Sequence, residues 1–159
     1  MSEEVIEKRI VLECKYLNNK YMKHLLEKLK TTVRYECTEE YGHILDVKEI
    51  LKILSHKIDR TNSDNIFNVQ FSATTLKPMA GKIMEGVVCM IYKDGIFITI
   101  MDRQKMLIPS VLLKAYKFDD KIPSYSDGMK TIMLGNTIQA KVTGVKYNKK
   151  NFSCFGCLI

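Results

Sequence analysis

The sequence predicts an α+β protein made of two small units, one with a single helix among strands and one of strands alone. Apolar residues alternate over residues 6–14 and then follow a helical period over residues 17–33. Residues 81–159 break into short alternating segments separated by turn residues. Between them, Lys77-Pro78 ends an alternating strand, and proline restricts the preceding residue to extended conformations. We therefore expect a defined crossing near residue 80, between units 1–80 and 81–159.

Composition places the chain among soluble globular proteins. Of its 159 residues, 46% are hydrophobic and 27% charged, and no apolar run approaches the roughly 20 residues that a membrane helix needs. Units of this size have marginal cores, so we expect them to pack on each other or on a partner. The acidic start Met1-Ser2-Glu3-Glu4 lacks the apolar segment of a secretory signal, and five irregularly spaced cysteines fit free thiols. We therefore expect a protein that stays in a reducing, intracellular compartment.

Positive charge is concentrated in the second half of the chain. Residues 1–80 hold 13 Lys and Arg against 12 Asp and Glu, a net charge of +1, whereas residues 81–159 hold 12 against 6, a net charge of +6. A local excess of this kind is typical of a polyanion-binding face. The alternative, that the lysines merely keep the surface solvated, stays open at this point.

The elements of the first unit follow from changes of period along the chain. Ile6, Ile10 and Leu12 alternate with mostly charged residues, as in a half-buried strand. A helical stripe follows, which Asn18 or Asn19 can cap at its start, and its members are Leu17, Tyr21, Met22, Leu25, Leu26, Leu29 and Val33. Residues 33–37 then alternate again, residues 38–42 form a turn, and residues 43–47 begin the next strand.

Residues 47–58 fit two different structures. No helix breaker interrupts them, and periodicity alone favours a helix, because one helical face would collect Val47, Ile50, Leu51, Leu54 and Ile58. Residues 59–65 form a polar loop, and residues 66–77 form the strand that leads to Pro78.

The second unit is predicted to be a five-stranded barrel. The strands are expected at residues 81–92, 96–101, 105–108, 137–147 and 152–159, with a tight hairpin at Lys93-Asp94-Gly95 and a stop at Pro109. A short buried turn at residues 111–113 and a long polar loop at 116–130 fill the middle. Short strands with a long middle connection suit the partly open oligonucleotide-binding (OB) barrel, whose exposed face and loops bind single strands.

An ordered set of motifs extends over nearly the whole chain. Its core is Phe67-x-Val69-x-Phe71-x-Ala73-x-x-x-Lys77-Pro78-x-x-Gly81-x-x-x-x-Gly86, accompanied by Met22-Lys23, Cys37-Thr38, Tyr41-Gly42-x-Ile44-Leu45 and Pro123-Ser124-Tyr125. Each motif alone is weak, but their order and near-constant spacing are specific. The set resembles the stalk subunit of DNA-directed RNA polymerases, which is the seventh subunit of eukaryotic RNA polymerase II and its archaeal counterpart.

The resemblance implies a fold and a role. It implies an N-terminal ribonucleoprotein-like α/β domain that docks at the base of the polymerase clamp, and a C-terminal OB barrel of the S1 type that faces nascent single-stranded RNA. It also implies a fourth-subunit-like stalk partner beside the large polymerase subunits. Over residues 47–58 it implies two strands with a bend instead of a helix, and we follow it there. The chain would then be nuclear if cellular. It would lie in the host cytoplasm and virion if encoded by a large DNA virus, and the Lys, Asn and Ile bias fits either origin.

The residues expected to dock on the polymerase form the tip turn Glu39, Glu40, Tyr41, Gly42 and His43. In the family this turn usually reads Cys-Thr-Gly-Lys-Phe-Gly, so Glu39 and Glu40 replace a glycine and a lysine.

The residues expected to bind RNA are Lys93, Phe97, Arg103, Lys105, Lys141, Lys146, Lys149 and Lys150. S1-type barrels commonly present two aromatics and a histidine, of which only Phe97 is present, with Asp94 and Pro109 at the other places. Phe97 is opposite in phase to Ile96, Ile98 and Ile100, so it lies either in the core or on the outer face. We therefore expect weak, phosphate-dominated RNA contact.

Catalytic, metal and cofactor sites are not expected. His24, His43 and His56 lie in different elements, and no motif links a carboxylate pair to a histidine or cysteine. Cys154 and Cys157 are three apart on a predicted strand and so point to opposite faces. Two alternatives to a polymerase subunit remain, which are a free-standing S1-type factor that binds single-stranded RNA and an assembly scaffold that touches no nucleic acid.

Overall fold

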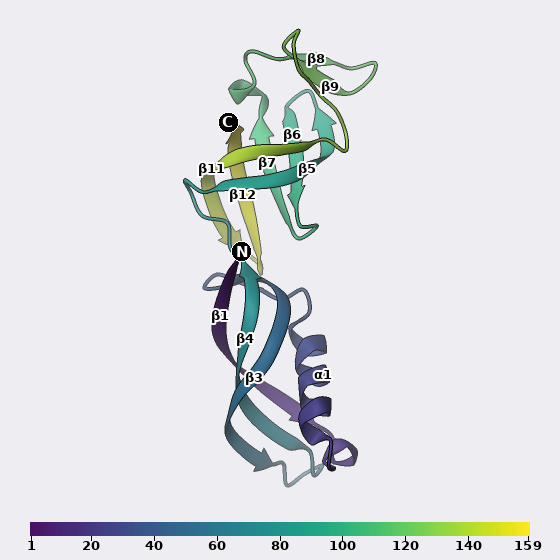
Figure 1. Ribbon diagram of the computed structural model, residues 1–159, viewed down its shortest axis with the longest axis vertical. Coiled ribbons are helices and arrows are strands. Elements are labelled where there is room, and N and C mark those ends of the chain that lie inside the picture. Colours follow the sequence, from purple (N-terminus) through teal and green to yellow (C-terminus); the bar gives the residue numbers. More distant parts are fainter. The chain divides into compact units, whose positions relative to one another are not determined.

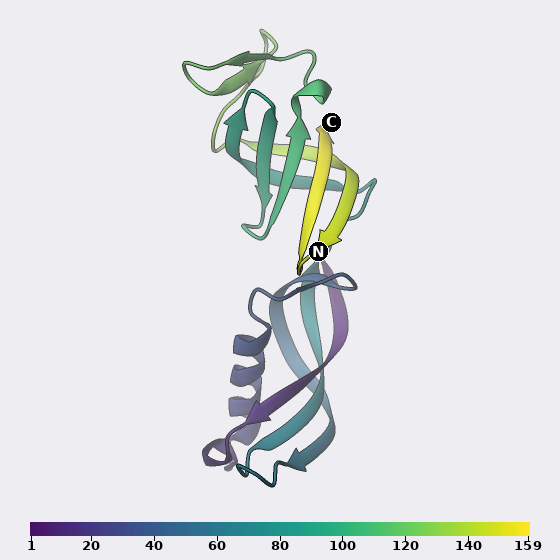
Figure 2. The same ribbon diagram turned by 180° about the vertical axis from the view of Figure 1, so that it is seen from behind.

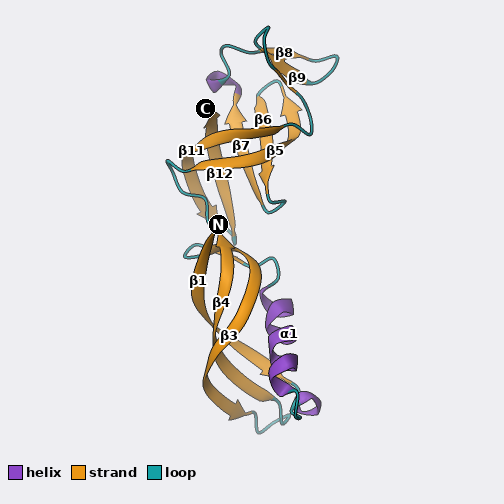
Figure 3. Ribbon diagram, viewed as in Figure 1, coloured by secondary structure: helices purple, strands orange, loops and turns teal.

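The computed structural model describes residues 1–159 and divides into two compact units, Met1–Lys77 and Pro78–Ile159 (Figure 1). The division falls at the Lys77-Pro78 bond. Strands dominate both units, and each has only short helical segments besides the single long helix of the first unit (Figure 3). No helix is both long enough and apolar enough to span a membrane.

The first unit is a four-stranded antiparallel sheet in the order β1-β4-β3-β2, with a single α-helix against one face (Figures 1 and 2). Its elements are β1 (Ser2–Leu12), η1 (Cys14–Tyr16), α1 (Tyr21–Val33), β2 (Cys37–Thr38), β3 (Gly42–Ile58) and β4 (Asn65–Leu76). The unit is therefore mostly β, and the ribonucleoprotein-like α/β domain implied by the resemblance is not clearly supported. The expected strand over residues 33–37 is wrong, because only Cys37 and Thr38 pair with β3.

The helix starts later than its apolar stripe indicated. It begins at Tyr21, and the residue in the cap position is Lys20, whose side chain makes no capping hydrogen bond. The Asn18 side-chain oxygen instead accepts a hydrogen bond from the Lys20 backbone N–H at 2.9 Å, closing a turn before the helix. The predicted asparagine cap is therefore wrong, because the Asn18 side chain bonds a backbone N–H that precedes the helix and none in its first turn.

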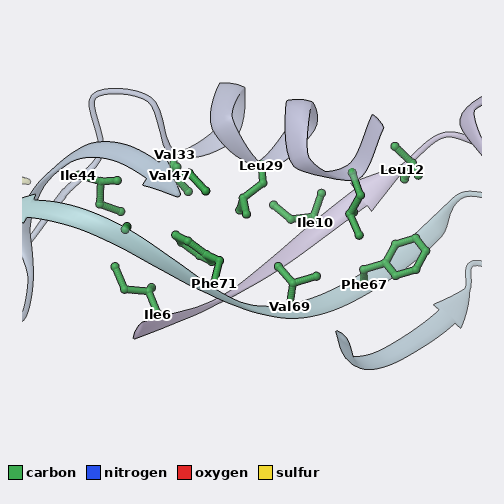
Figure 4. Close-up of a cluster of buried hydrophobic side chains, with 12 residues drawn as sticks. Ile6, Ile10, Leu12, Leu29, Val33, Ile44, Val47, Phe67, Val69 and Phe71 are labelled. Atoms are coloured by element: carbon green, nitrogen blue, oxygen red, sulfur yellow. The ribbon is translucent and has the colours of Figure 1, made fainter. Parts of the chain in front are cut away.

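The core of the first unit lies between α1 and the sheet. Leu25, Leu29 and Val33 of the helix are at most 1% exposed, and they face apolar side chains from three strands (Figure 4). These side chains include Ile6, Ile10 and Leu12 of β1, Ile44 and Val47 of β3, and Phe67, Val69 and Phe71 of β4. Because fully burying one large apolar side chain contributes about 1.5–3 kcal/mol, this cluster is the main source of stability in the unit.

Residues 47–58 belong to one long strand, β3, so neither a helix nor two separate strands is present. The pairing between β3 and β4 shifts register at four places. At each place β3 contributes an extra residue, so that Ile44, Val47, Ile50 and Ile53 face Thr75, Ala73, Phe71 and Val69. A β-bulge of this kind sets two residues of one strand against one of its partner. Repeated bulges therefore give β3 an apolar period of three, which resembles a helical pattern.

The second unit is a closed barrel in the order β11-β12-β7-β6-β5. Its strands are β5 (Ile83–Tyr92), β6 (Gly95–Ile100), β7 (Gln104–Pro109), β11 (Thr137–Asn148) and β12 (Asn151–Leu158). The expectation of a partly open barrel is wrong, because β5 and β11 pair from Val87 with Thr137 to Ile83 with Lys141 and close it. Each strand of the barrel therefore pairs with a neighbour on both sides.

The expected long polar loop at residues 116–130 is also wrong in part, because it is folded. It contains β8 (Lys117–Asp119) and β9 (Ser124–Ser126), which form a three-stranded sheet with β10 (Thr131–Ile132). Tyr125 is 2% exposed, and the single proton of its hydroxyl is shared between the backbone carbonyls of Tyr92 and Lys93, both within hydrogen-bond distance. The insertion is therefore anchored to the β5–β6 hairpin. The buried turn expected at residues 111–113 is wrong for two of its three residues, because Val111 and Leu112 of η2 (Ser110–Leu112) are 65% and 49% exposed and only Leu113 is buried.

Candidate nucleic-acid interface and docking tip

Phe97 lies on the outer face of the barrel. Ile96 and Ile98 are fully buried and Ile100 is 4% exposed, so this side of β6 fills the barrel interior. Side chains alternate between the faces of a strand, which turns Phe97 outward, where it is half-buried. The Tyr92 ring meets it edge-on, with ring centroids 6.3 Å apart and an interplanar angle of 86°. Phe97 is therefore on the face that a ligand can reach.

Strand pairing places three further apolar side chains beside Phe97. Met90 pairs with Phe97, Phe97 with Leu107, and Leu107 with Phe155, so the four lie across β5, β6, β7 and β12. Met90 is 38% exposed and Phe155 is 42% exposed. We call Met90, Phe97, Leu107 and Phe155 the apolar row. Sequence reasoning missed Met90, Leu107 and Phe155, because alternation indicates the outer phase of each strand but not which strands are neighbours.

Five of the predicted RNA-binding cations gather at one end of the barrel. The Gln104 side-chain amide donates to the Phe152 carbonyl at 2.9 Å, which joins the start of β7 to the start of β12. Lys146 pairs with Ser153 at the same end. We call the five residues the basic end, and they are Arg103, Lys105, Lys146, Lys149 and Lys150.

The turn that joins β11 to β12 has an unusual composition. Lys149 and Lys150 have φ angles of 50° and 63°, the left-handed region that Asn and Gly favour in two-residue hairpin turns. A residue with a Cβ atom in this region costs roughly 1–2 kcal/mol. The turn therefore presents two exposed cations where an uncharged Asn-Gly pair would fold more easily.

The other two predicted cations lie apart from the basic end. Lys93 is in the β5–β6 turn, at the opposite end of the barrel, where its carbonyl accepts the Tyr125 hydrogen bond. Lys141 pairs with both Cys157 and Ile83, in the stretch of β11 that is bonded to β12 and β5. The structure thus brings five of the seven predicted cations together and separates two.

The docking tip exposes only part of its predicted set. Glu39 and Glu40 are exposed in the turn between β2 and β3, whereas His43 is 6% exposed. Gly42 has a φ of 76°, and a Cβ atom there would lie 2.3 Å from the Leu76 carbonyl oxygen, so only glycine fits. The turn is held by a hydrogen bond from Lys77 Nζ to the Glu40 carbonyl at 3.1 Å.

Tyr41 is partly a core residue. Its ring is half-buried against the hydrophobic cluster, and its N–H donates to Thr38 Oγ1 at 3.1 Å. Burial raises the pKa of Tyr41, and the carboxylates of Glu40, Glu4 and Glu7 raise it further. The surface around the tyrosine is therefore acidic. A small hollow of about 170 Å³ beside it is lined by Ile6, Glu36 and Phe71 among others.

The remaining candidate chemical groups are dispersed. The His24 ring lies 5.1 Å from Tyr16, and the His56 ring stacks on Phe67 at 4.2 Å. Cys154 is buried, and burial raises its thiol pKa to about 11. No group of three or more His, Cys, Asp or Glu side chains is arranged to hold a metal ion.

Comparisons with known proteins cover both units. Residues 77–154 match the S1 RNA binding domain family. The chain is 24% identical to DNA-directed RNA polymerase II subunit RPB7 of Glycine max, over 97% of this chain and 89% of the relative. It is 26% identical to the RPB7 subunit of Saccharomyces cerevisiae, over 85% of this chain and 81% of the relative. It is also 26% identical to DNA-directed RNA polymerase V subunit 7 of Arabidopsis thaliana, over 77% of this chain and 70% of the relative. The resemblance is confirmed: both units of this chain are similar to the seventh subunit of eukaryotic DNA-directed RNA polymerases, and residues 77–154 match the S1 RNA binding domain.

Proposed function

We propose that this chain is a non-catalytic stalk subunit of a multisubunit DNA-directed RNA polymerase, which docks through its first unit and guides nascent RNA with its barrel. The observation that carries the proposal is the extent of the similarity, because the alignment with the soybean subunit spans both units and 97% of the chain. A solitary S1 module has no need of the sheet and helix formed by Met1–Lys77.

The barrel has the two features that nonspecific binding of single strands requires. Long cations at the basic end can neutralise phosphates without reading sequence, and the apolar row offers a ring on which a base can stack. The net charge of +6 on residues 81–159, from 12 cations and 6 acids, adds attraction at longer range. We infer that RNA contact is nearly sequence-blind and sensitive to salt.

The first unit supplies the polymerase contact in this proposal. It corresponds to the ribonucleoprotein-like docking domain of the family, in a form that is mostly β. In this proposal its contact surface at the tip is formed by the exposed Glu39 and Glu40 and the partly exposed Tyr41. Its partners are the large polymerase subunits and a fourth-subunit-like chain, and a cellular chain of this kind is nuclear.

Co-purification tests this proposal directly. The full chain carrying an affinity tag is expressed in the cells from which it comes, and bound proteins are identified by mass spectrometry, with the tag alone as control. We expect the two largest polymerase subunits and a smaller stalk partner in stoichiometric amounts. Recovery of RNA without polymerase subunits would instead favour the free-standing S1-type factor.

A further inference from the structure

We propose that Phe155 is a second stacking position for a nucleic-acid base, so that a bound single strand runs from Phe97 across Leu107 to Phe155 and on to the basic end. This inference rests on the proposed function, since it names how the barrel holds the strand. It adds a ring on β12 to a binding face for which the sequence indicated only one stacking ring, Phe97 on β6.

The first argument is the placement of the two rings. Phe97 and Phe155 pair with opposite sides of Leu107, so one strand separates β6 from β12. Neighbouring strands are about 4.8 Å apart, which sets the two backbones about 10 Å from each other on one face. Phe155 is 42% exposed, and an exposed flat ring is the group on which bases stack.

The second argument is the open flank of Phe155. On the side away from Leu107, Phe155 pairs with Gly144 of β11. A Cβ atom added at Gly144 would meet no atom within 4 Å, and its φ lies outside the left-handed region. By contrast, a Cβ atom at Gly156 would collide with the Met106 sulfur at 2.2 Å. Neither a close contact nor a left-handed φ requires glycine at position 144, and a glycine there places no side chain beside Phe155.

The third argument is charge, which selects the occupant. Residues 137–159, which form β11, its turn and β12, contain Lys141, Lys146, Lys149 and Lys150 and no Asp or Glu. Lys146 pairs with Ser153, which lies on the same face of β12 as Phe155 and about 7 Å from it along the strand. All charged side chains of these two strands and their turn are therefore cations, and an exposed apolar ring lies among them. This combination fits a polyanion that carries flat rings, which is a single-stranded nucleic acid.

A tryptophan reporter tests the inference on the full chain, because the sequence contains no tryptophan. Phe155→Trp keeps a stacking ring and introduces the sole indole fluorophore. Titration with an oligouridylate of about 12 nucleotides, within the range of site sizes for one OB barrel, should quench its emission. Inorganic polyphosphate binds the same lysines without bases and should leave the emission unchanged. The control Ile83→Trp, at a 57% exposed position on β5, should not be quenched by either probe.

Photocrosslinking gives a second readout that needs no variant. An oligomer of the same length containing 4-thiouridine is irradiated with the full chain, which is then digested with trypsin. Cleavage after Lys93, Arg103 and Lys150 separates Phe97, in residues 94–103, from Phe155, in residues 151–159. Adducts on both peptides are expected. Adducts on 94–103 alone would overturn the inference while leaving RNA binding intact, and adducts on neither would overturn RNA binding as well.

Affinity measurements complete the test. Phe155→Ala should weaken binding of the oligouridylate about five-fold or more, the lower limit for losing one stacked base. Gly144→Val should weaken it similarly, because the new side chain covers the open flank of the ring. Ile83→Ala should have no effect. Unchanged affinity in both Phe155→Ala and Gly144→Val, with melting temperatures equal to that of the parent chain, would mean that Phe155 serves a protein contact instead.

Discussion

Ile50 of β3 lies directly opposite Phe71 of β4, although the adjacent inward pairs are three residues away along β3 and only two residues away along β4. The difference arises because a bulge follows each of four inward residues of β3, which are Ile44, Val47, Ile50 and Ile53. The extra residues of two of these bulges, Leu51 and Leu54, are 47% and 41% exposed. A single strand thus places its inward apolar residues at a spacing of three, and three of the five apolar residues that a helix would bury, Leu51, Leu54 and Ile58, are exposed.

The bulged register predicts which residues of β3 support the fold. Ile53 packs against the core, so Ile53→Ala should lower the free energy of unfolding by about 1–3 kcal/mol. Leu54→Ala should change it by no more than about 0.5 kcal/mol, because Leu54 is largely exposed. Urea denaturation of the two variants measures the difference. Equal losses would contradict the assignment of the core face.

The lysine turn between β11 and β12 should oppose stability and favour binding. Replacing Lys149 and Lys150 by Asn and Gly relieves two left-handed residues, so the free energy of unfolding should rise by about 1–2 kcal/mol. The same change removes two cations and should weaken RNA binding and flatten its dependence on salt. Denaturation and binding titrations on one variant measure both. A variant that is stabilised but binds RNA as before would exclude the turn from the interface.

Position should matter more than total charge at the basic end. Lys146, Lys149 and Lys150 changed to Glu should weaken RNA binding and reduce the slope of log affinity against log salt by about 0.7 for each phosphate that is no longer neutralised. The matched control changes Lys114, Lys117 and Lys121 to Glu, which alters the net charge equally within the same unit. Filter binding at several salt concentrations compares them. Equal effects from the two triple variants would mean that only net charge attracts RNA.

At the tip, a change at Tyr41 should affect both docking and stability, because its ring packs against the core. Tyr41→Ala should release the chain from the polymerase but also lower its melting temperature, whereas Tyr41→Phe keeps the packing ring. Changing both Glu39 and Glu40 to Lys should reduce co-purification of the large subunits with little change in stability, since both residues are exposed. The control changes the exposed Glu27 and Glu49 to Lys. Normal recovery of polymerase with the tip variant would place the anchor elsewhere.

The buried thiol of Cys154 should make the protein less stable at high pH. Burial raises its pKa from 9.0 to about 11, so the folded chain keeps the proton over a range in which the unfolded chain releases it. The contribution of the protonated thiol to the free energy of unfolding is complete below pH 9. It is lost as the pH rises toward 11, by about 1–3 kcal/mol in all. Denaturation of the parent chain and of Cys154→Val between pH 8 and pH 11 isolates this effect. Parallel stability curves would show that the thiol does not titrate differently on folding.

Local pattern was sufficient where one residue and its immediate neighbours decide the outcome. The alternation of Ile96, Ile98 and Ile100 with Phe97 predicted a strand with one apolar face, and the structure turns that face inward. The amphipathic stripe predicted α1 because the 3.6-residue period is a property of the helix itself. The order of the motifs, a linear feature, was likewise enough to identify the polymerase stalk subunit that the comparisons confirmed.

The tertiary structure alone decided which residues of different strands are neighbours. Phe155 lies on the same face as Phe97, and Lys146 lies at the same end of the barrel as Arg103, only because β12 pairs with β7 in parallel. This pairing is set by the closure of the barrel. The bulges of β3 have the same origin, because its period of three is meaningful only against the period of two in β4. A sequence specifies the phase of each strand through local sterics, whereas register and neighbours depend on burying many distant side chains at once.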